Sequence, residues 1–328
     1  MRSFCLLIYV ATFLLSLPVW ASQVQGATPD ASAPATTAVT PAPTAVTTPA
    51  QTVRRVLVVS IDGLRPDLML LADCPTIRLL IRDGSYSFWA KTTEMGVTLP
   101  SHTSMVTGRE IVYHGIHWNG NTVPDGVEYQ YPQVPTLFEL AKEHGMSTAI
   151  VSGKAKFRYL ARPGSVDYLS VPSDPKISDE QTVDNAVRII REHQPDVMLL
   201  HLPDVDTVGH RDGWGTPEQL AAIERADAAL ARALDALDAA GHRDDTLIIL
   251  NADHGGWWKS HNGGDPRGRH IPWIVVGPGV RKNYDLNCER DLEIQIYDTF
   301  ATACQYLGIP LPEKCQGKPV NAAFIEPD

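Results

Sequence analysis

Residues 246–255 read TLIILNADHG and decide the fold. The run 246–250 consists of β-branched residues and leucine, which is typical of a strand buried on both faces of a parallel sheet. Asp253 and His254 follow almost at once, before two glycines. Ligands of open α/β sheets bind beyond the carboxyl ends of the strands, so this carboxylate and imidazole indicate a candidate site. For the motif alone, a turn aspartate beside a solvated histidine is the alternative interpretation.

The rest of the chain repeats this order of strand and acidic residue. Residues 56–61 (VLVVSI) precede Asp62 and Gly63, and residues 197–202 lead into a segment that contains Asp206. Further strands are expected at 148–151 and 271–276, and helices at 75–82, 135–143, 178–192, 216–240 and 296–307. The alternation predicts a layered α/β/α domain with a largely parallel central sheet.

The first 52 residues differ in composition from the rest. Residues 1–21 contain Arg2, then an apolar stretch, and end in Val-Trp-Ala, which is the layout of a signal peptide. An uncleaved membrane anchor is the alternative, but the apolar stretch is short for a membrane span. Residues 22–52 are mostly Ala, Thr, Pro, Ser and Gln and are expected to form a disordered linker. We therefore expect a catalytic domain at 53–328, exported to the periplasm or secreted, with no membrane insertion of the mature protein.

The charge balance restricts the partners. The first 52 residues hold one Arg and one Asp, so the net charge of −10 lies in the remainder of the chain. An acidic protein is not expected to bind nucleic-acid polymer through a basic surface. A small phosphate-containing substrate stays open, because a bound metal ion can reverse the local field.

Four cysteines follow the predicted signal peptide. In an exported protein such cysteines favour disulfides, and four of them allow three pairings. We expect a bridge between Cys304 and Cys315, because Gly308 and two prolines let the intervening chain turn back.

Three of the predicted strands are followed by carboxylates, namely those of Asp62, Asp206 and Asp253. Carboxylates held close together raise one another's pKa and cost stability unless cations compensate them. His210 lies four residues after Asp206, and the glycine before it would let a loop bring both side chains to one point. Mixed Asp/His ligation suits zinc, with manganese or iron as substitutes. Asp204 is the competing carboxylate in this segment.

Residues 98–102 read TLPSH and predict the start of a helix that continues to Thr107. Thr98 would lie at the helix N-terminus, where free amides and the macrodipole favour anions. A simple N-cap is the alternative role for this threonine. Beside a divalent ion, however, its hydroxyl becomes a usable nucleophile.

The ordered set of motifs carries a resemblance. Asp62-Gly63, Thr98-x-Pro-x-His, Asp206-x-x-Gly-His210 and Asp253-His254-Gly255 resemble the alkaline phosphatase superfamily. Within it, the chain is most similar to the type I phosphodiesterase/nucleotide pyrophosphatase family, especially its short bacterial exported members, over about residues 53–320. The resemblance implies an alkaline-phosphatase-like fold and a hydrolase of small phosphate esters with two divalent metal ions, usually zinc.

The resemblance also implies a ligand set. One ion would be held by Asp62, Thr98, Asp253 and His254. The other would be held by Asp206, His210 and a later histidine, for which we prefer His261 to His270. Asn119 lies where the family places an asparagine that binds a phosphate oxygen; its alternative role is that of a turn residue before Gly120.

The mechanism implied by the resemblance is an in-line attack by Thr98 that gives a phosphothreonine intermediate. Asn119 and the amides after Thr98 would stabilise the charged oxygens. Diesters are expected ahead of monoesters. Lys154 and Lys156 could approach a phosphate, although solvated lysines are commoner.

Two alternatives remain open at this point. A sulfatase-like hydrolase of the same superfamily is the runner-up, but Thr98 cannot be converted to formylglycine and His102 stands where arginine would be expected. The non-enzyme alternative is an exported binding protein that retains the metal site.

Overall fold

The computed structural model describes residues 54–173, 176–261 and 264–326. The predicted signal peptide and linker, which end at residue 52, lie outside the described residues. Among the helices of the described part, none combines the length and apolarity that a membrane crossing requires.

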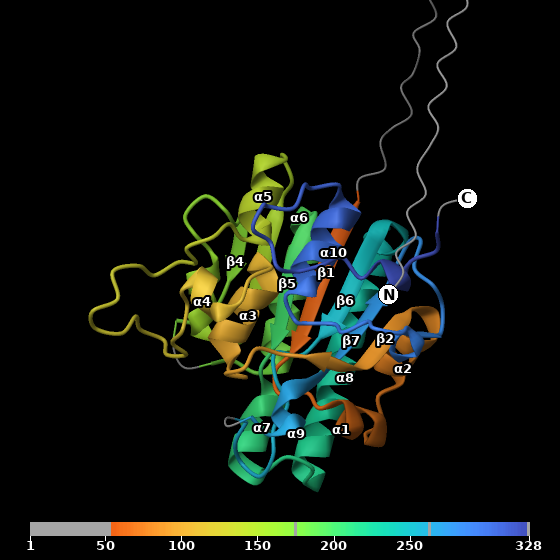
Figure 1. Ribbon diagram of the computed structural model, residues 1–328. Coiled ribbons are helices and arrows are strands. Elements are labelled where there is room, and N and C mark those ends of the chain that lie inside the picture. The colour runs from red at the N-terminus through yellow and green to blue at the C-terminus, as the bar shows by residue number, and fades with distance from the viewer. Residues whose placement is uncertain (1–53, 174–175, 262–263, 327–328) are drawn as a thin grey trace, which may run out of the picture. The chain divides into compact units, whose positions relative to one another are not determined.

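The described residues build one eight-stranded sheet in the order β4-β3-β5-β1-β6-β7-β2-β8 (Figure 1). All neighbouring strands pair in parallel except at β7, which runs against both β6 and β2. The prediction of a largely parallel sheet is therefore confirmed. The strands are β1 (Arg55–Ile61), β2 (Ser85–Lys91), β3 (Thr148–Ser152), β4 (Tyr168–Ser170), β5 (Val197–Leu202), β6 (Thr246–Asn251), β7 (His270–Val276) and β8 (Tyr284–Asp285).

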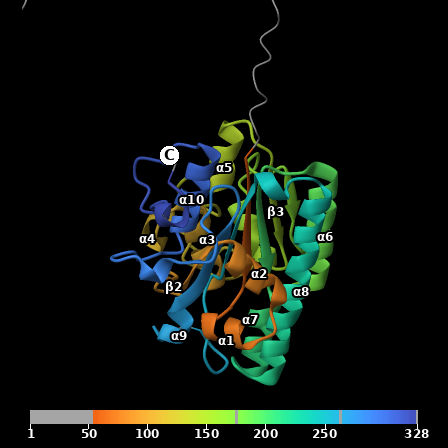
Figure 2. The ribbon, with the colours of Figure 1, turned by 90° about the vertical axis from the view of Figure 1, so that its right-hand side faces the viewer.

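Helices cover both faces of the sheet, as Figure 2 shows from the side. Helices α2 (Pro75–Asp83), α6 (Asp179–His193) and α8 (Pro217–Ala239) pack on one face, and α3 (Thr98–Thr107), α5 (Leu137–Glu143) and α10 (Asp298–Leu307) on the other. The shorter helices are α1 (Pro66–Leu71), α4 (Ile111–His114), α7 (Asp204–Asp212) and α9 (Pro266–Arg269). The layered α/β/α prediction is confirmed. It also explains why every residue of β5 and β6 is buried and why both strands are mostly apolar, as is typical of strands covered on both faces.

Capping residues set the helix boundaries. The Ser178 and Thr216 side chains accept hydrogen bonds from the N3 amides of α6 and α8, so these helices begin one residue after the predicted starts at 178 and 216. Thr136 forms a capping box with Glu139, so α5 begins at Leu137, two residues after the predicted start at 135. The closing helix α10 likewise begins two residues later than predicted, at Asp298.

The predicted disulfide is not formed, because Cys304 and Cys315 are both free thiols in the structure. Cys304 is fully buried in α10. The Cys315 thiol instead contacts the backbone carbonyl oxygens of Gly108, at 3.7 Å, and Gly317, at 3.5 Å.

A reciprocal cap joins the first residues of α6 and α7. The Asp179 amide donates to Asp204 Oδ2 and the Asp204 amide donates to Asp179 Oδ1, both at 2.9 Å. Asp179 Oδ2 is buried without a donor. Burial and the nearby Asp204 carboxylate raise the pKa of Asp179 well above its ordinary value. The charged form of Asp179 therefore destabilises the fold.

Replacing Asp179 by asparagine should raise the free energy of unfolding at pH 7 by about 1 kcal/mol, because the amide keeps the accepting oxygen and removes the buried charge that the Asp204 carboxylate repels. A raised folded-state pKa means that wild-type stability falls as pH rises above about 4, the unfolded value, so the gain should vanish below that pH. Urea unfolding between pH 3.5 and 7.5 measures both effects. Asp184→Asn, at an exposed position of α6, is the matched control. A less stable D179N protein at pH 7 would contradict the prediction.

Candidate metal centre

The carboxyl ends of β1, β5 and β6 bring three carboxylates together. Asp62 directly follows β1, Asp253 lies two residues beyond β6, and Asp206 lies in the first turn of α7, which follows β5. Their exposures are 0%, 0% and 5%. Gly63, at φ 74°, allows this approach: its amide donates to Asp253 Oδ1 at 3.1 Å, and an added Cβ would lie 3.0 Å from Asp206 Cα.

Asp206 and His210 lie on a helix, not on the loop expected from the sequence. Residues four apart share one face of a helix, and His210 Nε2 is 3.2 Å from Asp206 Oδ1. Gly209 serves packing rather than flexibility, since an added Cβ would lie 2.6 Å from the Trp214 ring. The structure therefore brings the two side chains together as expected, but on a helix and not on the predicted loop.

Three histidines present the same ring nitrogen to these carboxylates. The Nδ1 atoms of His210, His254 and His261 lie 2.9, 2.8 and 2.7 Å from the backbone carbonyl oxygens of Lys259, Gly255 and Gly96. A carbonyl oxygen can only accept, so each Nδ1 carries the proton. In the neutral ring, Nε2 is then left with a lone pair, the arrangement that backbone partners impose on metal-binding histidines.

These side chains form two groups whose ligand atoms lie within 4.8 Å of one another: Asp206, His210 and His261, and Asp62, Asp206 and His254. Asp253 Oδ2 lies 3.3 Å from His254 Nε2. The His254 and His261 rings stack with their centroids 3.7 Å apart. The structure thus brings all six of the Asp and His residues in the predicted ligand set together.

Several inward-facing atoms of this cluster have no hydrogen-bond partner, although they are buried: Asp62 Oδ1, Asp206 Oδ1, Asp253 Oδ2 and His254 Nε2. Unsatisfied acceptors in a native interior are costly and call for an explanation such as an ion. Mixed carboxylate and imidazole donors of this kind fit a divalent transition metal.

Burial raises the pKa of each carboxyl group, and the neighbouring charges either oppose or reinforce this effect. Burial would raise the pKa of Asp62, but Lys154 and His201 together hold it well below its ordinary value. For Asp253, burial and the Asp62 charge both act to raise the pKa. Burial, with His254 beside it, lowers the pKa of His261 to about 4, so this imidazole is neutral at physiological pH, as a ligand must be.

Thr98 is the first residue of α3, and Val97 holds the N-cap position. The Thr98 side chain makes no capping bond, so the N-cap alternative is wrong. Lys154 Nζ lies 3.4 Å from Thr98 Oγ1 and 2.6 Å from Asp62 Oδ2. The hydroxyl therefore lies beside the carboxylate cluster.

The amides after Thr98 are not free to bind an anion, contrary to expectation. The Leu99 amide donates to Asn119 Oδ1 at 2.9 Å, Pro100 has no N–H group, and the Ser101 amide donates to the carbonyl oxygen of Val97. Lys156 Nζ also lies 3.0 Å from Asn119 Oδ1. With its oxygen engaged twice, Asn119 retains its NH₂ group for another acceptor.

Two site residues were missed or undervalued by reasoning from the sequence. His201 lies in β5, and its Nε2 is 2.9 Å from Asp62 Oδ2. A lone histidine inside an apolar strand was the available signal. Lys154 bridges Asp62 and Asp206, with an Nζ–Oδ2 distance of 2.7 Å to Asp206. Burial would lower the pKa of Lys154, but these carboxylates raise it above its ordinary value.

The competing candidates lie elsewhere. Asp204 takes part in the reciprocal cap with Asp179. His270 stacks on Trp89, with ring centroids 4.1 Å apart, and belongs to neither of the two groups. His102, which stands where the sulfatase pattern has arginine, is by contrast buried beside the cluster: its Nε2 bonds Ser60 at 2.8 Å, and its Nδ1 lies 3.6 Å from Asp253 Oδ2.

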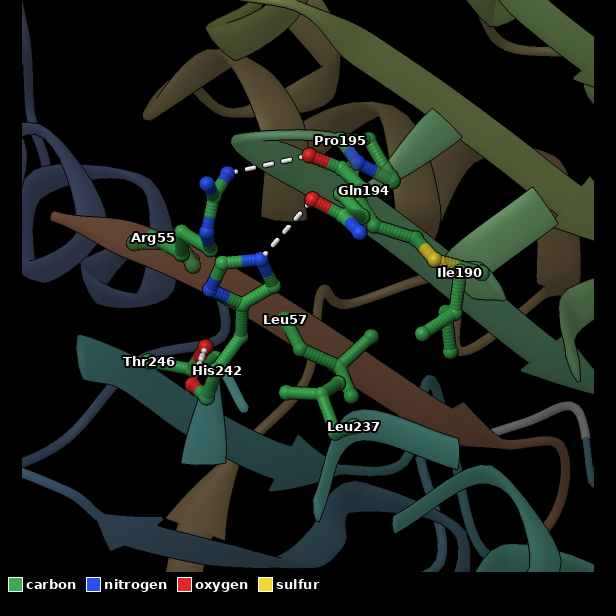
Figure 3. Close-up of a pocket in the computed structure, with 10 residues that line it drawn as sticks. Arg55, Leu57, Ile190, Gln194, Pro195, Leu237, His242 and Thr246 are labelled. Carbon is green, nitrogen blue, oxygen red and sulfur yellow. Dashed lines mark hydrogen bonds between the residues drawn. The ribbon is translucent and has the colours of Figure 1, made fainter. Parts of the chain in front are cut away.

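A small cavity at the opposite, amino ends of the strands contrasts with this centre. Figure 3 shows Arg55 and His242 closing it through hydrogen bonds to Gln194. The cavity has a volume of about 20 Å³, room for about one water molecule. It offers no space for a substrate.

The sequence of the chain is similar to a known family and to several curated proteins. The profile of a family described as type I phosphodiesterase / nucleotide pyrophosphatase matches residues 56–256. A 2,3-bisphosphoglycerate-independent phosphoglycerate mutase 2 of Methanosarcina acetivorans is 28% identical over 150 residues, which are 44% of this chain and 26% of the relative. Human ectonucleotide pyrophosphatase/phosphodiesterase family member 7 is 24% identical over 221 residues, 61% of this chain and 47% of the relative. The chain thus spans about a quarter to a half of these curated relatives.

The fold is also similar to that of a solved structure. Murine ectonucleotide pyrophosphatase/phosphodiesterase 5 superposes with a TM-score of 0.70 at 14% identity, covering 83% of this chain and all of the murine one. This similarity confirms the predicted alkaline-phosphatase-like architecture.

Proposed function

Because the chain belongs to the type I phosphodiesterase/nucleotide pyrophosphatase family, we propose that it is a metal-dependent phosphoric ester hydrolase with Thr98 as its nucleophile. The proposed ligands are Asp62, Thr98, Asp253 and His254 for one ion, and Asp206, His210 and His261 for the other. Zinc is the proposed metal, because the donors are carboxylates and imidazoles.

The observation that carries the proposal is the set of three imidazoles whose backbone bonds fix the Nδ1 proton. Their Nε2 lone pairs face carboxylate oxygens, and two electron-rich atoms do not attract each other. His254 Nε2, for example, lies 3.4 Å from Asp62 Oδ1 and 3.3 Å from Asp253 Oδ2. Divalent cations between them would turn repulsion into ligation.

Each chain residue then has a defined task. Two bound divalent ions would make the Thr98 hydroxyl nucleophilic and offset the negative charge on the reacting oxygens. Thr98 Oγ1 gives up its proton and attacks phosphorus in line, the bond from phosphorus to the ester oxygen breaks, the alcohol leaves with a proton, and a phosphothreonine results. Asn119 Nδ2 binds a non-bridging phosphate oxygen. Water then attacks phosphorus, the bond from phosphorus to Thr98 Oγ1 breaks, the phosphate product is released, and a proton from the water returns to Oγ1.

Phosphomonoester hydrolysis is the second candidate. Lys154 Nζ lies 3.4 Å from the Thr98 hydroxyl, and Lys156 lies against Asn119. Two cationic side chains suit the dianion of a monoester better than the single charge of a diester. Burial and the neighbouring Lys154 lower the pKa of Lys156 to about 8. A bound phosphate dianion would favour the charged form of Lys156.

A turnover screen tests the function. We expect the purified, zinc-supplemented protein to hydrolyse bis(p-nitrophenyl) phosphate or p-nitrophenyl phosphate at least about 10³-fold faster than p-nitrophenyl sulfate, since the site is built for phosphoryl oxygens and a threonine nucleophile. Elemental analysis should find two metal equivalents per chain. The ratio of kcat/KM for the two phosphates decides between diester and monoester preference. Metal binding without turnover of any ester would support the exported binding protein instead.

We further propose that the substrate is a small phosphate ester and that the protein acts outside the cytoplasm. A murine relative of the same fold has been solved in complex with AMP, which supports nucleotide esters as the first compounds to try. Export is supported by the layout of residues 1–21 and is tested by fractionation of cells that produce the full chain.

A further inference from the structure

Lys154 lies where positive charge is most needed in the cluster. Its Nζ is 2.6 Å from Asp62 Oδ2 and 2.7 Å from Asp206 Oδ2, and only 11% of its side chain is exposed. The two carboxylates come from different segments, after β1 and in α7. One ammonium therefore joins two acids that the proposed function assigns to different metal ions.

The ammonium compensates only part of the buried charge. Asp62, Asp206 and Asp253 supply three carboxylates, and Asp62 Oδ1, Asp206 Oδ1 and Asp253 Oδ2 have no hydrogen-bond donor. Divalent ions bound at those oxygens would contact the carboxylates of Asp62 and Asp206, which the Lys154 ammonium also contacts. Like charges in so small a buried volume repel strongly, because the interior screens them less than water does. Full metal occupancy and a bridging ammonium therefore oppose each other.

The backbone of Lys154 is fixed, whereas its side chain can move. The Lys154 amide donates to Ser152 Oγ at 3.0 Å, and Ser152 Oγ also bonds His201 Nδ1 at 2.9 Å. At Gly153, an added Cβ would lie 2.4 Å from Pro203 Cγ, so the preceding turn is tightly packed. The flexible four-carbon stem is the part that can relocate the charge. Lys154 Nζ also lies 3.4 Å from Thr98 Oγ1, the direction in which the charge can move.

We propose that Lys154 is an exchangeable counter-ion of the metal centre: it bridges Asp62 and Asp206 in the metal-free protein and is displaced toward the phosphoryl side of Thr98 when divalent ions bind. This inference rests on the proposed function. It makes Lys154 a positioning residue for the metals, which holds the ligands in place and sets how tightly the ions bind. If the bridging state dominates in the metal-free protein, only the remaining fraction of molecules can bind metal. The apparent dissociation constant for metal then rises by the reciprocal of that fraction.

The experiment compares Lys154→Met with Lys156→Met. Both variants lose one positive charge and keep an unbranched side chain, but Lys156 contacts Asn119 rather than the carboxylates. Zinc affinity is measured by titration against a competing chelating dye, and thermal unfolding is followed with and without zinc. We expect K154M to bind zinc about tenfold more tightly than K156M, as a nine-tenths populated bridging state requires. The metal-free K154M protein should also melt at a lower temperature than metal-free K156M, because its carboxylates are uncompensated.

Equal or weaker zinc binding by K154M than by K156M would overturn the inference. If K154M folds only in the presence of zinc, the loss of zinc from the loaded variant to excess chelator is timed instead. Slower loss than from wild type supports the inference, and equal or faster loss overturns it. Failure of the proposed function looks different, because the wild-type protein would then bind no divalent ion or hydrolyse no phosphate ester.

Discussion

Replacing Thr98 by alanine is expected to lower kcat on aryl phosphate esters by about 10⁴-fold or more, the scale seen when a covalent nucleophile is removed from an otherwise intact site. Thr98 is the first residue of α3 and its side chain makes no capping bond, so its loss does not unfold the helix. The six proposed Asp and His ligands are unaffected by this change, and metal content should be unchanged. Steady-state kinetics and elemental analysis on the same preparation measure both quantities.

Thr98→Ser is the matched control for this variant. It keeps the hydroxyl on the same backbone position and should retain measurable turnover together with a covalent phosphoryl-enzyme. Mass spectrometry of acid-quenched reactions should find an added phosphoryl group on residue 98 in wild type and T98S, and none in T98A. Turnover by T98A at the wild-type rate would show that water attacks phosphorus directly.

Removing the divalent ions is expected to abolish turnover and to destabilise the protein, because three buried carboxylates lose most of their compensating charge. Dialysis against a chelator followed by measured additions of zinc should restore activity in proportion to the metal bound, saturating at two equivalents. Unchanged activity in demetallated protein would contradict the two-ion mechanism.

The same centre should lose metal on acidification, and the direction follows from the pKa shifts. The Asp206 carboxylate, whose Oδ1 lies 3.2 Å from His210 Nε2, raises the pKa of His210, so protons compete for this nitrogen from a higher pH. Burial lowers the pKa of His261 to about 4, so this ligand resists protonation. As pH falls, His210 should therefore be protonated before His261, and zinc should be lost at that step. His210→Asn should bind zinc more weakly at neutral pH but should no longer show this first loss. Zinc retained after dialysis between pH 5 and 8 measures the effect.

The sequence predicts the parts of the site that depend on strand ends. Parallel strands open at one edge, so the strand patterns alone are enough to place Asp62 and Asp253 together. The contributions of His201 and Lys154 could not be predicted, because each depends on the register between β3, β5 and β1, which pairs Ser152 with His201 and Ser60 with His201. Helix α7 is hard to distinguish from a loop in the sequence, because a glycine and few strong helix formers hide its propensity. The free thiols of Cys304 and Cys315 show the limit of spacing arguments, since loop length does not determine where sulfur atoms point.

The backbone carbonyls that orient His210, His254 and His261 have a consequence for how such a protein can diverge. A backbone carbonyl oxygen is still present when the side chain of its residue is replaced. The exposed Lys259 can therefore be substituted while its carbonyl oxygen still fixes which ring nitrogen of His210 faces the centre. Substitutions of residues around the cluster can then change which alcohol group of an ester is accepted, while the arrangement of histidines and carboxylates stays the same. This separation suits a lineage whose matched members bear names as different as a phosphoglycerate mutase and a nucleotide pyrophosphatase.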